Sequence, residues 1–533
     1  MKNLLQEIKM PAMYAVAAFL MLSGYHYWQE QHLKPPASGK ASMAVSSHVD
    51  ANGHLIMGKE EEHSDHPTIN VKSDKLDLTI DLVGGSVMKA SLPSFTKSLQ
   101  DKTLVSVLDD TGSNFQIVEF GVVGDYDLRY HVVSNGLQLK PGQDQLVVKL
   151  EGKNKQGLVI TKTITLNRGR YDIGVVTNAK NTGASDWSGN FYQQIKRAEP
   201  LSEQGIGRRT YHGMSFYQDN KPYTKLDYSD MRKRDLSTNV KGGWIAGQQH
   251  YFLAALIAPE GLMQNFFSAT HDNNSKYILG MFSPKFKLSS GESSTYSSKF
   301  YVGPEDVKVL DQLSKGLGMT IDYGFLWFLS EGLMWLLRKI QMLVGNWGVS
   351  IILITFVVKL AFYNFSNKSF TSMAKMSKLA PKIKEIQEQY KDDKAKLQQE
   401  IMAFYSKEKL NPMSGCFPML VQLPFFIALY WMLIESVELR QAPFFGWIHD
   451  LSVKDPLYVL PVVMGASMLA QQLLSGQTNQ DSSQKQMMMV VPFVCTFIFI
   501  NFPAGLVLYM LTNNLLSMAQ QSFVKWKISR QDA

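Results

Sequence analysis

A single full charge lies within the five long apolar segments of the C-terminal half. Lys359 lies in the segment 347–365, about six residues or roughly 9 Å from one end at 1.5 Å per residue. A lysine so placed can snorkel to the lipid headgroups. It can instead face a water-filled cavity between helices. Thr355, one helical turn earlier on the same face, slightly favours a polar stripe, and both interpretations remain open.

Other apolar segments also carry polar side chains. Gln422 lies beside Leu423 and Pro424, and Ser467 lies four residues before Gln471. In the last segment, Thr512 and Asn513 follow Tyr509 by three and four residues. Each such residue alone is more often a contact between helices than a site. Together with Lys359 they could line one hydrophilic substrate pocket, although spacing alone does not assign their facing.

The segment 366–413 contains ten lysines against six acidic residues. Apolar residues in it step by three and four as in a coiled-coil seam, namely Met376, Leu379, Ile383, Ile386 and Tyr390. Asp392 with Asp393 can cap a second helix. We therefore expect an antiparallel helical hairpin with its tip near Lys391.

One edge of this hairpin is basic and is formed by Lys375, Lys378 and Lys382. It is either a solvated face whose charges set the topology, or a dock for an acidic partner. Ribosomal RNA, a targeting factor or anionic lipid would fit such a dock.

Signatures of catalysis are missing from the sequence. There is no HExxH, GxSxG or Walker-A motif, and no aspartate pair lies within the apolar segments. His63-x-x-His66 beside Asp65 could ligate a metal, but its polar surroundings offer no rigid supporting shell. Two cysteines exclude a disulfide scaffold. We expect no enzyme, no cofactor and no metal.

The domain organisation of the 533-residue chain decides where these residues lie. The chain is 45% hydrophobic and 19% charged, with mean hydropathy −0.11 and net charge +8. Residues 11–28 lack charge, follow two lysines and end in aromatic residues, which predicts a transmembrane anchor within a domain 1–28. A cleaved signal peptide is the alternative. Residues 29–70 have the composition of a flexible linker.

The pattern of residues 71–321 predicts one large all-β sandwich. Short β-branched stretches recur, several with period two, at 76–83, 115–120, 145–150, 158–166, 171–176, 251–257 and 295–302. The region contains no cysteine, so an oxidising compartment would leave it without a disulfide. In the next part, 322–345, the apolar run 325–337 is too short to span easily and predicts an amphipathic interfacial helix.

Five apolar spans are then expected within a core at 346–522, followed by a short tail at 523–533. The spans lie at about 347–365, 415–434, 458–474, 487–500 and 503–518. Placing the lysine-rich segment inside the cell puts 14 basic loop and tail residues inside and two outside. Both termini are then cytoplasmic and the β-domain is periplasmic. With the anchor, the fold class is a multi-domain membrane protein with six spans.

The core at about 346–522 resembles the YidC/Oxa/Alb family of membrane protein insertases. The motifs that carry the resemblance are, in chain order, Gly415-Cys416-Phe417-Pro418, Gln422-Leu423-Pro424, Ser436-Val437-Glu438-Leu439-Arg440-Gln441-Ala442-Pro443-Phe444, Trp447-Ile448-His449-Asp450-Leu451 and Pro503-Ala504-Gly505-Leu506-Val507-Leu508-Tyr509. The layout is similar to the Gram-negative branch, with an anchor and a large periplasmic β-supersandwich.

The resemblance implies a multi-pass insertase of the bacterial inner membrane. Such a protein takes nascent membrane proteins, alone or with the Sec translocon, and releases them into the phospholipid bilayer. It also implies a positively charged groove formed by the five core helices, in which Lys359 matches the usual arginine. A lysine keeps the charge but loses the bidentate fork. The hairpin matches a family region linked to substrate handling and targeting factors.

Two other function classes are alternatives to the insertase. Polar residues in several spans would also suit a small-solute transporter, but no inverted repeat or paired broken helices are visible. A tethered carbohydrate-active enzyme would need converging carboxylates or histidines in the β-domain, and it would leave five core spans without a role.

Overall fold

The computed structural model describes residues 47–49, 55–57, 66–125, 127–200, 210–271, 276–390, 393–408, 417–475 and 482–531. The expected anchor at 11–28, most of the linker at 29–70, Lys391 and Asp392 lie outside them. Two compact units are present. The β-unit extends to Glu331 and also includes Trp431–Ala442, and the helical unit comprises Gly332–Tyr430 and the residues from Pro443 onward.

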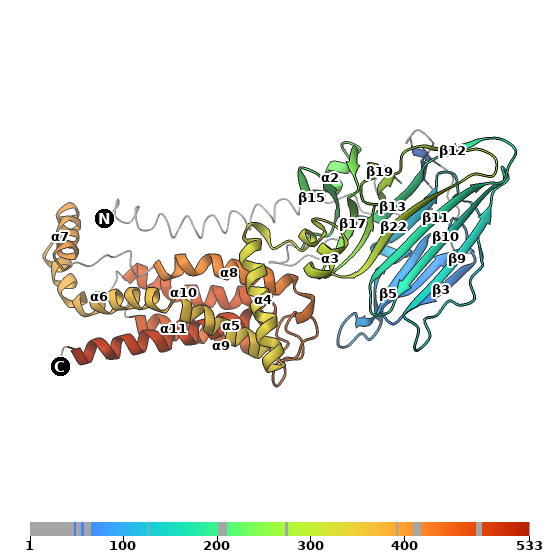
Figure 1. Ribbon diagram of the computed structural model, residues 1–533. Helices are drawn as coiled ribbons and strands as arrows, with labels where there is room; N and C mark the ends of the chain where they lie inside the picture. Colours follow the sequence, from blue (N-terminus) through green and yellow to red (C-terminus); the bar gives the residue numbers. More distant parts are fainter. Residues whose placement is uncertain are drawn as a thin grey trace. The chain divides into compact units, whose positions relative to one another are not determined.

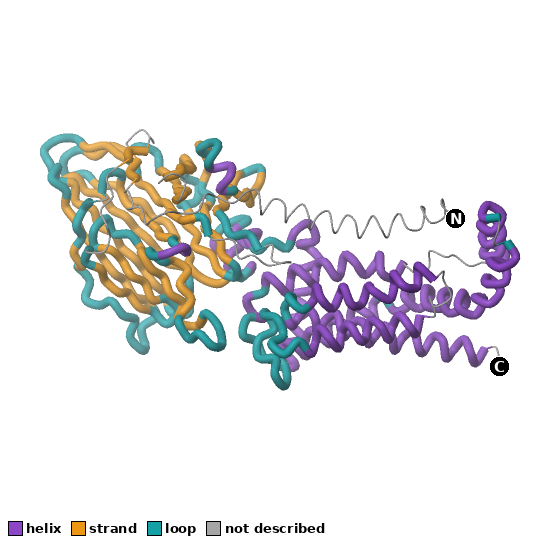
Figure 2. Tube along the Cα trace, turned by 180° about the vertical axis from the view of Figure 1, so that it is seen from behind, coloured by secondary structure: helices purple, strands orange, loops and turns teal. Residues whose placement is uncertain are grey.

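Antiparallel strands form two large sheets in the β-unit (Figures 1 and 2). The first runs in the order β15 (Lys221–Leu226), β14 (Met214–Gln218), β17 (Trp244–Gln249), β18 (Phe252–Ile257), β22 (Ser293–Pro304), β11 (Asp172–Asn181), β10 (Leu158–Asn167), β9 (Gln145–Lys153) and β8 (His131–Val132). The second runs in the order β16 (Ser237–Lys241), β19 (Met263–His271), β20 (Lys276–Phe282), β13 (Phe191–Ala198), β7 (Gln116–Val122), β5 (Val87–Thr96), β4 (Asp77–Asp81) and β3 (Thr68–Lys72).

Smaller elements complete this unit. Strand β6 (Leu104–Leu108) pairs with β5, and short sheets join β1 (Ser47–Val49) to β2 (Leu55–Met57) and β12 (Trp187–Gly189) to β21 (Phe286–Leu288). Its short helices are α2 (Tyr228–Met231), α3 (Val307–Leu313), η2 (Gly112–Asn114), η3 (Leu317–Thr320), η4 (Gly324–Leu326) and η6 (Val437–Leu439). Each strand expected from the sequence overlaps a strand of the structure, so the all-β expectation is confirmed.

Alternating side chains explain why these strands form a sandwich. Along β10, buried and half-buried residues alternate strictly from Leu158 to Asn167. Because successive side chains of a strand point to opposite faces, one face of β10 packs inward. The buried residues of both large sheets, among them Ile160 and Phe120, form one core cluster. The hydrophobic effect on this shared core holds the two sheets together.

A lysine interrupts the apolar inner face of β10. Lys162 is fully buried, and its ammonium forms an ion pair with Asp125 at 3.1 Å. It also donates hydrogen bonds to the carbonyl oxygens of Gly84 and Phe120, while the Tyr130 hydroxyl donates to Asp125 at 2.7 Å. Burial lowers the pKa of Lys162, and the Asp125 carboxylate opposes that shift. A charge therefore sits in the core with its partners supplied by other strands and turns.

The second unit is helical (Figure 1). Its helices are α4 (Trp327–Val344, which begins in the β-unit), α5 (Trp347–Ala361), α6 (Tyr363–Gln389), α7 (Lys394–Lys407), α8 (Phe417–Glu435, which ends in the β-unit), α9 (Val459–Ser475), α10 (Ser482–Phe499) and α11 (Ala504–Gln531). Helix α11 packs against α5, α6 and α9, and α9 packs against α10. The expected order of a β-rich region followed by a helical region is thus confirmed.

The first of the five spans expected in the core is broken. Where the sequence predicts one apolar segment over 347–365, α5 ends at Ala361 and α6 begins at Tyr363, with a bend of 71°. Phe362 lies at the bend with φ −96° and ψ 8°, outside the helical region of either helix. No glycine or proline marks this position, so the residue types alone did not reveal it. The lysine-rich helix consequently starts three residues earlier than expected.

A helix that crosses a membrane must be both long and apolar. Within the described ranges, no helix taken singly meets both requirements, whereas α5 and the first part of α6 meet them jointly as a bent pair. Three shorter apolar helical stretches are Gln422–Glu435, Val459–Leu474 and Met489–Phe499.

Helix α4 occupies the position expected for the interfacial helix. It exposes large apolar side chains, with Trp335 56% and Leu343 86% exposed, while Leu337 is fully buried. Apolar side chains therefore lie on the exposed side of α4 as well as on its buried side. A lipid interface would cover such an outer face.

Candidate functional site

A line of polar side chains runs along α11. Tyr509, Asn513, Ser517, Gln521 and Lys525 follow one another at intervals of four residues. Residues four apart are neighbours on a helix surface, so these five form a continuous stripe that winds slowly around α11. We call this set the α11 stripe. It gives α11 a hydrophilic side among helices that are otherwise mainly apolar.

Lys359 of α5 contacts this stripe. Its side chain is half-buried, and Nζ donates a hydrogen bond to Ser517 Oγ at 2.8 Å. The Ser517 hydroxyl in turn donates to the Asn513 carbonyl oxygen at 2.7 Å, which leaves its oxygen free to accept from the ammonium. The charge expected to matter most is thus held against α11 by a residue that the sequence analysis did not single out.

Gln422 of α8 contacts the same stripe at Tyr509. Its amide Nε2 donates to the Tyr509 hydroxyl at 3.0 Å, and Tyr509 is 1% exposed. The Phe426 ring, one turn along α8, stacks near Tyr509 with ring centroids 6.3 Å apart. Leu423 and Pro424 instead point outward and are exposed. The Gln422-Leu423-Pro424 motif therefore presents one polar group to the stripe and two apolar groups to the surroundings.

Two expected site residues bond within their own helices. Thr355 Oγ1 donates to the Ile351 carbonyl at 2.6 Å, and Thr512 Oγ1 donates to the Leu508 carbonyl at 2.8 Å. Hydroxyls satisfied in this way are common in membrane helices and need no partner across the interface. Both residues are buried, but the structure does not join them to Lys359 through a hydrogen bond.

Two acceptors on the α11 stripe stay unsatisfied within the described part of the chain. Asn513 Oδ1 and Gln521 Oε1 are both buried and have no hydrogen-bond partner there. A buried acceptor left without a donor costs about 1–3 kcal/mol. Water or a polypeptide N–H entering beside Lys359 could satisfy these oxygens. The stripe therefore offers two open acceptors, and two cations lie on it: Lys359 of α5, bound to Ser517, and its own Lys525, which donates to the Leu474 carbonyl oxygen.

Sequence reasoning missed Ser517, Gln521 and the bond that joins α11 to α9. In that bond Asn514 Nδ2 donates to Ser467 Oγ at 3.2 Å. The spacing of four from Tyr509 and Asn513 was the available signal for Ser517 and Gln521. Gln521 lies beyond the expected end of the last span at about residue 518, whereas α11 continues to Gln531; Ser517 lies within that span.

The residues expected to form a cytoplasmic dock lie on α6. Lys375, Lys378 and Lys382 are all exposed, while the apolar residues of the expected seam are half-buried. Asp393 caps α7, because its carboxylate accepts from the Lys396 backbone N–H at 3.1 Å. Among the residues that the structure describes, no cluster of three or more His, Cys, Asp or Glu side chains could hold a metal ion.

A β-sandwich unit and a helical unit with a polar stripe define a two-part protein whose sequence matches known families over both parts. Residues 68–336 match the YidC periplasmic domain family, and residues 339–531 match the 60Kd inner membrane protein family.

Curated relatives match most of the chain. The membrane protein insertase YidC of Coxiella burnetii is 39% identical over 97% of this chain and 96% of the relative, and that of Pseudomonas fluorescens is 42% identical over 86% and 84%. A crystal structure of an active YidC insertase with its first transmembrane domain resolved aligns with 86% of this chain and 94% of that one, at 19% identity and a TM-score of 0.38. The chain belongs to the YidC family of inner-membrane protein insertases, which carry a periplasmic domain.

Proposed function

We propose that this chain inserts newly made proteins into the bacterial inner membrane and helps them fold there, without enzymatic chemistry. The relatives named as insertases at 39–42% identity support the activity. The observation that carries the mechanism is the Lys359 ammonium on Ser517, next to the open acceptor Asn513 Oδ1. We infer that these groups line a hydrophilic substrate groove together with Gln422 and Tyr509.

The physics of this groove follows from the hydrocarbon barrier. Polar backbone and side chains cannot cross hydrocarbon without hydrogen-bond partners. A hydrated groove that reaches part of the way shortens the distance over which they lack water. The Lys359 ammonium attracts acidic residues of the entering segment. The apolar part of the substrate then moves sideways into lipid, driven by hydrophobic transfer, and this step requires no nucleotide.

The proposed topology places six spans in the membrane, with both termini cytoplasmic and the β-unit periplasmic. The unequal distribution of basic residues between loops supports this orientation. Helix α4 would then lie in the outer interface, where its exposed Trp335 and Leu343 contact lipid. The proposed domain limits are those expected from the sequence, except that the lysine-rich helix begins at Tyr363 and the last helix continues to Gln531.

The proposed partners follow from the same arrangement. Nascent membrane proteins are the substrates and phospholipid is the surrounding medium. Helices α6 and α7 would form the cytoplasmic hairpin, whose exposed Lys375, Lys378 and Lys382 suit an acidic ribosomal surface or a targeting factor. The Sec translocon is proposed as a partner for larger substrates.

Replacement of Lys359 tests the charged groove. In cells depleted of their own insertase, Lys359→Glu should abolish insertion of a small membrane protein with an acidic periplasmic segment, measured by protease protection. Lys359→Arg keeps the cation and should support insertion. Lys308→Glu on α3 reverses an exposed charge of the β-unit and serves as the control. Insertion by Lys359→Glu at the wild-type level would refute the role of the charge.

A further inference from the structure

The end of α8 and the turn that follows it are fastened to the β-sandwich. This segment, Trp431–Ala442, belongs to the β-unit. The Arg440 guanidinium donates to the carbonyl oxygens of Thr96 and Lys97, and the Gln441 amide donates to the Thr96 carbonyl at 2.9 Å. His250 lies with Nε2 3.1 Å from the Ile434 carbonyl oxygen. We call Trp431–Ala442 the attachment segment.

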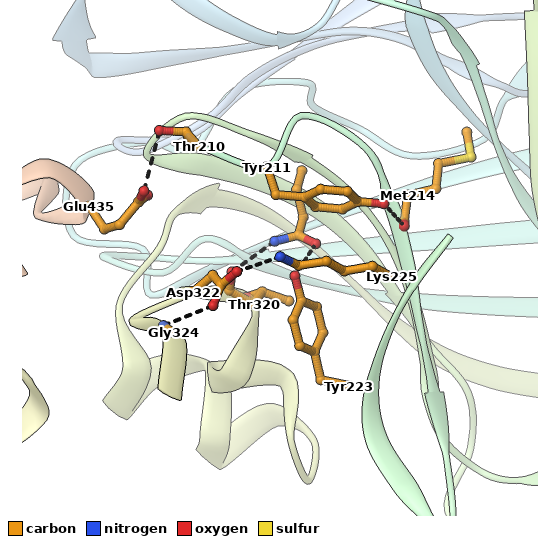
Figure 3. A network of polar contacts seen from close by, with 10 residues as sticks. Thr210, Tyr211, Met214, Tyr223, Lys225, Thr320, Asp322, Gly324 and Glu435 are labelled. Atoms are coloured by element: carbon orange, nitrogen blue, oxygen red, sulfur yellow. Dashed lines mark hydrogen bonds and ion pairs between the residues drawn. The ribbon is translucent and has the colours of Figure 1, made fainter. Parts of the chain in front are cut away.

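Two buried carboxyl groups lie at this attachment. Glu435, the last residue of α8, is 7% exposed and accepts a hydrogen bond from Thr210 Oγ1 at 3.3 Å (Figure 3). Glu305, just after β22, is 5% exposed, and its Oε1 has no hydrogen-bond partner within the described part of the chain. The Glu305 backbone N–H donates to the Tyr251 carbonyl oxygen at 2.8 Å, and His250, the residue before Tyr251, is the one that contacts Ile434 of the attachment segment. Burial first, and the charge of Glu435 second, raise the pKa of Glu305 well above its ordinary value.

The neighbouring charges do not neutralise this pair. Lys225 is the cation that acts on Glu435, but its ammonium is already paired with Asp322 and lies 4.9 Å from the centre of the Tyr211 ring (Figure 3). Asp322, whose carboxylate also accepts from the Gly324 N–H at 2.9 Å, adds a third negative charge. The other charged or titratable groups on the elements packed here include Arg440 and Glu438 of the attachment segment, Asp306 next to Glu305, and Tyr211, Tyr223, Tyr301, His212 and His250. Among the described residues, Lys225, the one cation that acts on Glu435 electrostatically, is therefore shared with Asp322.

We propose that the Glu305–Glu435 pair is a proton-dependent latch that holds the attachment segment to the β-sandwich. Two ionised carboxylates in one dry site repel each other, whereas a pair that holds a proton is less repelled and supplies an O–H donor. The protons belong to the pair and leave it in coupled steps. The latch is independent of the insertase activity, because it concerns only contacts within the β-unit.

The direction of the pH effect follows from linkage. A carboxyl whose pKa is higher in the folded state than in the unfolded state binds more protons when folded. Its stabilising contribution is complete below the unfolded pKa of about 4.3 and is lost as pH rises through the folded value. The attachment segment should therefore be held most firmly in acid and should loosen as the periplasm becomes neutral or alkaline.

Hydrogen exchange of the full-length protein in detergent micelles tests the latch. Protection of peptides covering 431–442 is measured by mass spectrometry from pH 5 to pH 8.5 and corrected for the intrinsic exchange rate. In the wild type we expect protection to fall by up to about tenfold per pH unit over the window in which the pair ionises. Glu305→Gln and Glu435→Gln should each flatten this profile, because the amide cannot ionise. Glu260→Gln, at an exposed position of the β-unit, should leave it unchanged.

Folding and latch opening are separated by a second set of peptides. Peptides from β10 (Leu158–Asn167) report the sandwich core, and their protection should be the same in all variants. If one glutamine variant loses β10 protection, the other decides the question. A wild-type profile that is flat from pH 5 to pH 8.5, or glutamine variants that keep the wild-type slope, would overturn the proposal. Persistence of the slope would point to His250 or His212 as the titrating group.

Discussion

Removal of one member of the buried pair Lys162–Asp125 should destabilise the β-sandwich far more than removal of both charges. Both side chains are fully buried, and the ammonium lies 3.1 Å from the carboxylate. In Asp125→Asn the Lys162 charge stays in the core without its counter-ion. Breaking a buried pair in this way costs about 3–5 kcal/mol. The double variant Lys162→Met with Asp125→Asn has no buried charge and should be within about 1 kcal/mol of the wild type or more stable.

Native-state hydrogen exchange of β10 and β11 amides in the full-length protein provides the assay, because these strands lie inside the first large sheet. A loss of 3–5 kcal/mol corresponds to exchange that is roughly two to four orders of magnitude faster. The matched control is Asp77→Asn, which breaks the Lys72–Asp77 pair at 2.9 Å. Its side chains are 50% and 27% exposed, so we expect a cost below about 1 kcal/mol.

The contrast between the variants decides whether the reasoning is correct. If Asp125→Asn accelerates exchange no more than Asp77→Asn does, the burial of the charge has been misjudged. If the double variant is as unstable as Asp125→Asn, the loss comes from packing, from the Tyr130 hydrogen bond or from the Gly84 and Phe120 carbonyl oxygens that lose their donor, rather than from the uncompensated ammonium.

Three further predictions concern local structure and the candidate site. Asn346→Ala removes the side-chain cap that accepts from the Val349 N–H at 3.0 Å and should cost about 0.5–2 kcal/mol, measured as faster exchange in the first turn of α5. Gly157→Ala should destabilise the turn between β9 and β10 by about 1–3 kcal/mol, because Gly157 has φ +88° and a Cβ there would lie 2.7 Å from Gly183 N; exchange of β9 amides measures this, and Gly124→Ala, at φ +96° in open space, isolates the clash. Ser517→Ala removes the acceptor of Lys359 Nζ and should reduce insertion of acidic substrates more than of neutral ones, measured by protease protection; equal effects on both would argue against a positioning role.

Residue patterns alone were sufficient where the determining contacts are local. The period-two alternation over 158–166 predicted β10, and the structure confirms a strand at Leu158–Asn167. The apolar run at 458–474 likewise matches α9 at Val459–Ser475. These predictions worked because side-chain periodicity is set by backbone geometry within one element.

Contacts between distant residues were beyond the reach of those patterns. Lys162 sits at an inward position of β10, but its partner Asp125 comes from a turn that only the packing of two sheets brings near. The break at Phe362 carries no glycine or proline, and the apolar sequence runs through it without a signal. The attachment of Trp431–Ala442 to the β-unit rests on partners such as Thr96, more than 300 residues away in the chain.

By itself the sequence determined the division into a β-rich and a helical part and the family resemblance. It also showed that Lys359 is the one full charge within the five apolar segments of the core. Only the tertiary structure decided what that charge touches: Ser517 lies 158 residues further along the chain. The physical reason is that composition and periodicity report how each element is buried, whereas a hydrogen bond of 2.8 Å requires two helices to be placed side by side. That placement depends on the packing of all their neighbours at once.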